Sequence, residues 1–197
     1  MMKIEPVTLQ GERVTLIPMK IEHLDGLFDA IICGDVWAYR IEQITTKEGL
    51  REFMQVALDG EKEKAIYAFT IIDNESDKII GTTRFADISY PNYSLEIGWT
   101  SISPEVMRSK VNTECKYLLL KHCFETLKTV RVCFKTLSIN KRSQNAILRI
   151  GAKHEGTLRW IGKTSEGDYV DVVYFSVIQP EWNDVKLHLE NLLSKTY

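Results

Sequence analysis

The sequence predicts an α+β, mixed α/β fold with a central mixed, mostly antiparallel sheet, helices on both faces and one parallel β-α-β crossover. Polar turn clusters at residues 73–77 and 163–168 separate β-rich runs, which predicts two antiparallel hairpins. A strand at 95–102, a helix at about 113–127 and an alternating strand at 131–137 follow one another, so these two strands should be parallel. The predicted order is β α α β β β α β α β β α, which places helices on both sheet faces.

The first part of the chain predicts one strand and two helices. Residues 13–18 (RVTLIP) alternate in polarity and end at a proline, as a strand does. Apolar residues then recur at helical spacing over 23–32, and Gly34-Asp35 marks the stop. A second helix is predicted over 46–58, with Thr45 or Thr46 as its cap and an apolar face of Leu50, Phe53, Met54 and Ala57.

The remaining elements follow from the same signals. The first hairpin has strands at 64–72 and 78–85, and Gly81 within the second strand predicts a bulge or a close backbone approach. A short helix, KRSQNAILRI, ends at Gly151. The second hairpin and a final amphipathic helix complete the chain, with strands at 153–161 and 169–178 and a helix opening at Pro180.

Composition excludes several classes of protein. With 197 residues, 44% hydrophobic and 26% charged content, the chain is typical of a globular protein, and the absence of linkers and repeats predicts one domain over 1–197. A net charge of −2 argues against a nucleic-acid partner. No run of 18 uncharged apolar residues and no leader are present, so we expect no membrane association and a cytoplasmic location.

Cysteine spacing gives no sign of a metal site. The four cysteines lie outside C-x-x-C pairs and have no histidines at zinc-ligand spacing, so we expect no metal and interpret them as buried, reduced thiols: Cys33, Cys115, Cys123 and Cys133.

The stretch from residue 95 to 125 predicts an anion site. A strand delivers the chain into the N-terminus of a long helix, where unpaired backbone N–H groups and the helix dipole favour an anion such as a pyrophosphate. Between positions 108 and 121 the chain has one acidic residue, Glu114, and four basic residues, which gives a local net charge of +3. The basic residues are Arg108, Lys110, Lys116 and Lys121. Solvated charges on an exposed helix face are the alternative interpretation.

Four passages, EIGWT, NTECKYLLL, NKRSQNAILRIGA and EGTLR, resemble the GCN5-related N-acetyltransferase (GNAT) superfamily, in the branch of the ribosomal-protein alanine N-acetyltransferases. The resemblance runs from GERVTLIP to PEWNDVKLHL and implies a GNAT-like sheet. It further implies an acyltransferase that moves an acetyl group from acetyl-CoA, as cosubstrate, to a primary amine of a small molecule or a protein N-terminus. The resemblance also implies that the amine attacks the thioester directly, without a covalent enzyme intermediate. Whether the chain is a monomer or a homodimer stays open.

The resemblance also assigns the acetyl-CoA site. The family loop reads Gln/Arg-x-x-Gly-x-Gly/Ala, and the chain departs from it with Met107, Lys110 and Asn112, although Asn112 is a good helix N-cap. In the family, the strand before the loop separates from its neighbour, and its backbone meets the pantetheine arm. The matching residues in this chain are Trp99, Thr100, Ser101 and Ile102. The loop amides should meet the phosphates, and they belong to Arg108, Ser109, Lys110, Val111, Asn112 and Thr113. The Trp99 side chain is alternatively part of the core.

The catalytic candidates are Glu96, Asn140 and Ser143. Asn140 and Ser143 match the N-x-x-S of the branch, in which Asn approaches the pantetheine and the hydroxyl lies near the leaving thiolate; helix capping is the alternative for both. Glu96 is the candidate base, because it points opposite to its neighbours on the central strand and partial burial would raise its pKa. Asp87 is the rival base, and either carboxylate is alternatively a surface group.

The acceptor side is predicted only coarsely. Four aromatic residues are candidate walls of the acceptor cleft: Trp37, Tyr39, Phe85 and Tyr93. His122 lies on an apolar helix face and is interpreted as a core histidine whose hydrogen bonds are satisfied. Because the loop glycines are missing, a non-catalytic CoA-binding or regulatory module is the alternative function.

Overall fold

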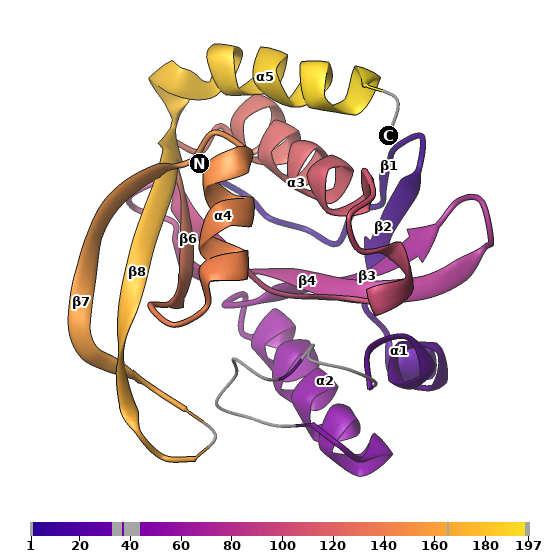
Figure 1. The fold of residues 1–197 in the computed structure, drawn as a ribbon. Coiled ribbons are helices and arrows are strands. Elements are labelled where there is room, and N and C mark those ends of the chain that lie inside the picture. Colours follow the sequence, from indigo (N-terminus) through magenta and orange to yellow (C-terminus); the bar gives the residue numbers. More distant parts are fainter. Residues whose placement is uncertain (1, 33–36, 38–43, 165, 196–197) are drawn as a thin grey trace.

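The computed structural model describes residues 2–32, 37, 44–164 and 166–195. Its strands form one eight-stranded sheet in the order β1-β2-β3-β4-β5-β6-β8-β7, with helices on both faces (Figure 1). The predicted helix stop at Gly34-Asp35, together with Cys33 and Tyr39, lies outside the described residues.

The strands are β1 Leu9–Gln10, β2 Val14–Pro18, β3 Tyr67–Asp73, β4 Lys78–Ser89, β5 Ser94–Ile102, β6 Arg131–Leu137, β7 Lys153–Lys163 and β8 Tyr169–Ile178. The α-helices are α1 Leu24–Ile31, α2 Lys47–Lys62, α3 Val111–Lys121, α4 Lys141–Arg149 and α5 Trp182–Ser194. Short 3-10 turns cover Ile21–His23, Pro104–Val106 and Gln179–Glu181, and a π-helical turn, His122–Thr126, continues α3.

The pairing of the strands confirms the predicted fold. The two predicted hairpins are present as β3–β4 and β7–β8, and both are antiparallel. Only β5 and β6 pair in parallel among the described strands, and α3 connects them. The sheet is therefore mixed and mostly antiparallel, with one β-α-β crossover.

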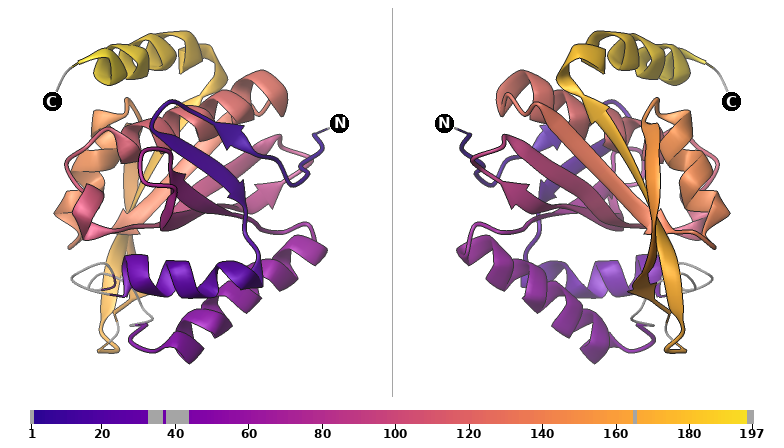
Figure 2. Two further views of the ribbon diagram at one scale, coloured as in Figure 1. Left: turned by 90° about the vertical axis from the view of Figure 1, so that its right-hand side faces the viewer. Right: turned by 90° about the vertical axis from the view of Figure 1, so that its left-hand side faces the viewer.

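Two helices cover one face of the sheet. α1 and α2 pack beneath β3 and β4 and form a core with Leu27, Met54 and Ala68 (Figure 2). The predicted cap of α2 is confirmed, because Thr46 Oγ1 accepts a hydrogen bond from the Gly49 amide at 3.1 Å. α2 extends beyond the predicted end at residue 58 to Lys62.

The opposite face is covered by α3 and α5. The alternating side chains of the sheet that face them, such as Leu95, Phe134 and Phe175, form the larger core. Cys115 and Cys123 are buried free thiols within that core, as predicted, while Cys133 on β6 is half-buried. Among the helices of the described residues, none is long and apolar enough to cross a membrane.

Glu114 fastens α3 to the sheet. Its buried carboxylate accepts hydrogen bonds from three consecutive backbone amides at the β1–β2 corner, those of Glu12 at 2.9 Å and of Arg13 and Val14 at 2.8 Å. The short strand β1 that forms this corner was not predicted. These bonds hold the first turns of α3 in place, and α3 begins beside the candidate site.

The predicted cap of α3 is wrong. The helix begins at Val111, so Asn112 is its second residue and the capping position falls on Lys110. Ser109 Oγ instead accepts a hydrogen bond from the Val111 amide at 3.3 Å. The Ser109 hydroxyl, one residue before the capping position, thus has the role that we assigned to the side chain of Asn112.

Candidate active site

β5 and β6 diverge in the middle of the sheet. They pair in parallel only from Ser94 to Glu96, opposite Arg131 to Cys133. Beyond this point β5 stays with β4 and β6 stays with β8. We call this divergence the fork; it leaves backbone groups of both strands available to a ligand.

A bulge in β5 shapes one arm of the fork. Gly98 pairs with Arg84 and Ser101 pairs with Thr82, so two residues of β5 stand opposite one residue of β4. Trp99 in the bulge has a positive φ of 50°, which is unusual for a bulky residue. The bulge turns the Trp99 side chain into the fork, where it is partly exposed, so Trp99 is not a core residue.

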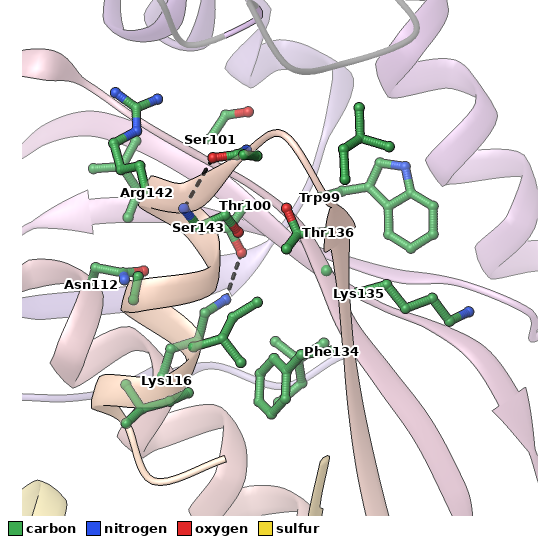
Figure 3. Close-up of a pocket in the computed structure, with 18 of the residues that line it drawn as sticks. Trp99, Thr100, Ser101, Asn112, Lys116, Phe134, Lys135, Thr136, Arg142 and Ser143 are labelled. Carbon is green, nitrogen blue, oxygen red and sulfur yellow. Dashed lines mark hydrogen bonds between the residues drawn. The ribbon is translucent and has the colours of Figure 1, made fainter. Parts of the chain in front are cut away.

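A cavity of about 1050 Å³ opens at the fork. On the α3 side it is lined by side chains of the loop after β5, of α3 and of α4, including Asn112, Arg142 and Ser143. On the α2 side it is lined by Trp37, Phe53, Glu96, Lys135 and Tyr174. Figure 3 shows Asn112, Arg142 and Ser143 on one side of β6 and Trp99 and Lys135 on the other. The cavity therefore reaches both faces of the sheet through the fork.

Glu96 lies at the point where the strands separate. Its carboxylate is buried and lies against Gly98, where a Cβ atom would come within 2.8 Å of Oε1. The Lys135 ammonium lies 2.8 Å from Glu96 Oε2 and also forms an ion pair with Asp87. Three strands, β4, β5 and β6, thus each contribute one charged group to a cluster on the α2 side.

Burial changes the pKa of Glu96. Loss of water around the carboxyl raises its pKa to about 7, and the positive charge of Lys135 opposes this rise. The hydrogen bond from Lys135 lowers the pKa of Asp87, which is more exposed. The structure thus separates the two candidate carboxyl groups: Glu96 titrates near neutral pH, and Asp87 stays ionised. Glu96 thus meets the condition of burial that we gave for a raised pKa.

Basic and polar groups gather on the α3 side. The buried Lys116 ammonium donates to Thr100 Oγ1 at 2.5 Å, and Arg149 donates to Thr113 Oγ1 at 2.9 Å. Ser101 pairs with Thr82, so its side chain faces α1 and α2 rather than α3, and its Oγ is buried at the cavity wall without a hydrogen-bond partner. The chain reverses at Arg108, whose φ is +61°, and enters α3. The first-turn amides of α3 and these cations suit a ligand with negative charge and hydrogen-bonding groups.

Asn140 and Ser143 meet at the start of α4. Asn140 Oδ1 accepts a hydrogen bond from the Ser143 amide at 3.0 Å, which is the capping role considered as an alternative. Both residues also line the cavity. Capping and ligand contact are compatible, because the cap uses the Ser143 amide and leaves its hydroxyl available.

Most of the predicted site residues come together at this cavity. Its lining includes ten of them: Glu96, Trp99, Thr100, Ser101, Ile102, Arg108, Ser109, Asn112, Asn140 and Ser143. Lys110, Val111 and Thr113 are not part of the lining. Val111 and Thr113 are buried instead, Val111 in the core above the sheet.

Of the predicted acceptor walls, Trp37 is at the cavity, where its ring contacts Phe53 edge-on. The prediction that Phe85 is a wall of the acceptor cleft is wrong. Its side chain on β4 points into the larger core, so it is fully buried on the α3 face and stacks on His122. Tyr93 is likewise not at the cavity but packs beside that core. His122 packs against the core, as predicted, and stacks on Phe85, but the prediction that its ring is satisfied by hydrogen bonds is wrong, because its buried Nε2 has no partner.

Sequence reasoning assigned Lys116 only to the general positive charge of the anion site, and it missed other charged or aromatic residues of the cavity lining, among them Lys135, Arg142, Arg149 and Tyr174. The alternating polarity of strand 131–137 indicates that Lys135 lies on its polar face, but nothing in the sequence indicates that Lys135 pairs with Glu96. No group of three or more potential metal ligands occurs within residues 2–32, 37, 44–164 and 166–195.

Comparison with known proteins places the chain among acetyltransferases. Residues 13–153 match the family profile described as "Acetyltransferase (GNAT) domain". The chain is 29% identical over 176 residues to the uncharacterized N-acetyltransferase p20 of Bacillus licheniformis, covering 89% of this chain and 98% of that protein. The structure is similar to a GCN5-related N-acetyltransferase from Brucella melitensis, with 26% identity, a TM-score of 0.89 and coverage of 98% and 87%.

A ribosomal-protein-S5-alanine acetyltransferase from Vibrio fischeri shares the fold with a TM-score of 0.74, covering 89% of this chain and 98% of that one. At 17% identity this likeness concerns the fold alone.

Proposed function

Because the chain belongs to the GNAT acetyltransferase family, we propose that it transfers an acetyl group from acetyl-CoA to a primary amine of a small molecule or a protein N-terminus. One observation carries the proposal: the cavity crosses the sheet at the fork, with cationic and amide donors on the α3 side and a buried carboxyl on the α2 side. Acetyl-CoA and the acceptor amine would approach from opposite faces and meet between β5 and β6.

The residues on the α3 side fit acetyl-CoA, which when bound supplies the acetyl group as a reactive thioester. The first-turn amides of α3 and the nearby Arg108 and Arg142 would hold the phosphates. The backbone of β5 at the bulge, where the pairing with β4 is interrupted, would hydrogen-bond the pantetheine arm. Lys116 lies below this path and adds positive charge.

Glu96 would act as the general base. An amine is protonated at neutral pH and must lose a proton before it can attack, and a carboxylate whose pKa is near 7 is suited to accept it directly or through one water. Asp87 is the weaker candidate, since the hydrogen bond from Lys135 lowers its pKa and with it its basicity. On the opposite side of the fork, the Ser143 hydroxyl would hydrogen-bond the leaving sulfur while Asn140 fixes the start of α4.

A non-catalytic CoA-binding module is the second candidate, favoured by the loop before α3. Met107, Lys110 and Asn112 stand where the family motif has its signature residues, and Ser109 occupies the Val111 amide. Side chains at these positions restrict how closely a phosphate can approach the backbone. In this second candidate function the protein binds acetyl-CoA at the same site but does not catalyse acetyl transfer.

The two candidates are separated by binding followed by turnover. Thermal unfolding with and without acetyl-CoA measures binding, and release of the CoA thiol measures transfer over a panel of polyamines, arylalkylamines, amino acids and short peptides with free N-termini. Stabilisation together with thiol release supports the acetyltransferase. Stabilisation without release for every amine supports the module, and no stabilisation refutes both.

Glu96→Gln tests the base. We expect turnover to fall by roughly 100-fold or more, the usual contribution of a general base, with little change in the acetyl-CoA dissociation constant. Glu155→Gln is the matched control: Glu155 pairs with Arg131 on the same sheet face but does not line the cavity, so its turnover should match the wild type. Equal losses of turnover and of acetyl-CoA affinity in Glu96→Gln would assign Glu96 a structural role.

A further inference from the structure

Lys135 occupies a special position at the fork. It lies on β6 two residues beyond Cys133, the last residue that pairs with β5. Its ammonium is 2.8 Å from Glu96 Oε2, forms an ion pair with Asp87, and lies 5.4 Å from the centre of the Tyr174 ring. Lys135 therefore spans the gap between the two diverging strands on the acceptor side.

We propose that Lys135 is a positioning residue: held by Asp87 and Tyr174, its ammonium fixes the Glu96 carboxylate at the fork so that it faces the incoming acceptor amine. The inference rests on the proposed function, in which Glu96 is the base. Lys135 is not assigned a contact with either substrate. It acts through Glu96.

The geometry of the cluster supports this role. Exposure of the side chains rises from 5% for Glu96 to 26% for Lys135 and 59% for Asp87, so Lys135 connects a buried carboxylate to an exposed one. Asp87 adopts a left-handed backbone conformation with φ of 45°, next to an irregularity in the β4–β5 pairing. Such a conformation is uncommon outside glycine, and Asp tolerates it better than most residues.

The two neighbours of Glu96 act on its proton in opposite directions. The hydrogen bond and positive charge of Lys135 lower the pKa of Glu96 against the effect of burial, whereas the negative charge of Asp87 raises it. Removing Lys135 should therefore raise this pKa, and removing Asp87 should lower it. A side chain that only packs would move it in neither direction.

Other charged groups around Glu96 are placed differently. The Arg84 guanidinium on β4 stacks between the rings of Phe53 and Trp99, at 4.3 and 5.2 Å from their centres. Cys133 faces Glu96 across the strand pair, and burial raises the pKa of its thiol, which keeps it neutral. The acidic residues of α1 on this face, Asp25 and Asp29, are exposed. Lys135 and Asp87 are thus the two groups to change.

The test is a direct titration of the Glu96 carboxyl in the free protein. Protein labelled with carbon-13 at the glutamate carboxyl is titrated by NMR, and the Glu96 resonance is assigned by its loss in Glu96→Gln. We expect a midpoint near 7 in the wild type. Lys135→Met should raise it by about one pH unit or more, and Asp87→Asn should lower it. Lys135→Arg keeps the charge and should stay close to the wild type.

Midpoints that do not move in Lys135→Met and Asp87→Asn, or that move in the same direction, would overturn the inference. If Lys135→Met fails to fold, judged by far-UV circular dichroism, Asp87→Asn decides, because Asp87 is exposed; a midpoint that is unchanged or higher in that variant also overturns the inference.

Kinetics separates this inference from the proposed function. With an amine that the panel identifies, the acidic limb of the pH profile of kcat/KM should move in the same order as the NMR midpoints. If the limb persists in Glu96→Gln, Glu96 is not the base and the proposed mechanism fails. If it disappears in Glu96→Gln but does not move in Lys135→Met, the mechanism stands and the positioning role of Lys135 is wrong.

Discussion

Replacing Glu114 by Gln tests whether one buried carboxylate fixes α3 to the sheet. The substitution preserves the shape of the side chain but removes the charge that accepts three backbone hydrogen bonds at 2.8–2.9 Å. Hydrogen bonds to a charged group contribute roughly 1.5–3 kcal/mol each. The amide oxygen of Gln still accepts from one or two of these N–H groups, while its NH₂ group points a donor at the remainder.

We therefore expect Glu114→Gln to lower the free energy of unfolding by about 2–4 kcal/mol, which is less than three full bonds and more than a surface substitution. For a chain of this size the midpoint of thermal unfolding should fall by roughly 5–12 °C. Urea unfolding followed by circular dichroism measures the free energy, and an unchanged m-value would show that the transition itself is preserved.

Glu190→Gln is the control for Glu114→Gln. Glu190 on α5 accepts a hydrogen bond from the Tyr117 hydroxyl at 2.8 Å, but the pair is exposed, so the change should stay within about 0.5 kcal/mol. A loss below about 1 kcal/mol in Glu114→Gln, or a similar loss in both variants, would refute the reasoning. In that case the packing of the core, rather than the carboxylate, positions α3.

Two further predictions concern β4 and β5. A Cβ atom at Gly81 would collide with the Ser101 carbonyl oxygen on the neighbouring strand, so Gly81→Ala should lower the free energy of unfolding by about 1–3 kcal/mol. Gly156→Ala is the control, because no atom lies within 4 Å of the new methyl group. In the same urea experiment it should change the free energy of unfolding by less than about 0.5 kcal/mol. Burial raises the pKa of Glu96 from its usual value of 4.5 to about 7, so between these values the folded chain holds a proton that the unfolded chain has released. The stability of the wild type relative to Glu96→Gln should consequently fall by on the order of 1–3 kcal/mol from pH 4.5 to pH 7 and stay level above it, and a difference that is constant with pH would contradict this.

Local signals in the sequence were sufficient to predict three of the strand pairings. Alternating polarity and the turn clusters predicted both hairpins, and the strand, helix and strand from residue 95 to 137 predicted the parallel pair. β1 was missed because two residues, Leu9 and Gln10, are too short to show a period. The cap of α3 was misplaced because Ser109 and Asn112 are both good capping residues and only the tertiary position of the helix selects one.

The geometry of the site was less accessible from sequence. Nothing in LEIGWTSI indicates that Trp99 takes a positive φ, since that conformation depends on how β4 and β5 pair. The same bulge decides whether Trp99 faces the core or the cavity. Lys135 and Glu96 are 39 positions apart in sequence and meet only because β6 pairs beside β5 for three residues and then diverges. Phe85 was misplaced because the alternation of a strand does not reveal which face holds the ligand.

The opening of the cavity on both faces of the sheet bears on how new specificities arise in such a protein. In the proposed arrangement the acceptor is surrounded by α2 and the β6–β8 face, while acetyl-CoA contacts α3 and α4, and only β5 and β6 serve both. Substitutions at Phe53 or Tyr174 could remodel the choice of amine without altering the walls that bind the cosubstrate. Evolution, or a directed library confined to the acceptor walls, can therefore explore new acceptors while the donor half of the enzyme stays constant.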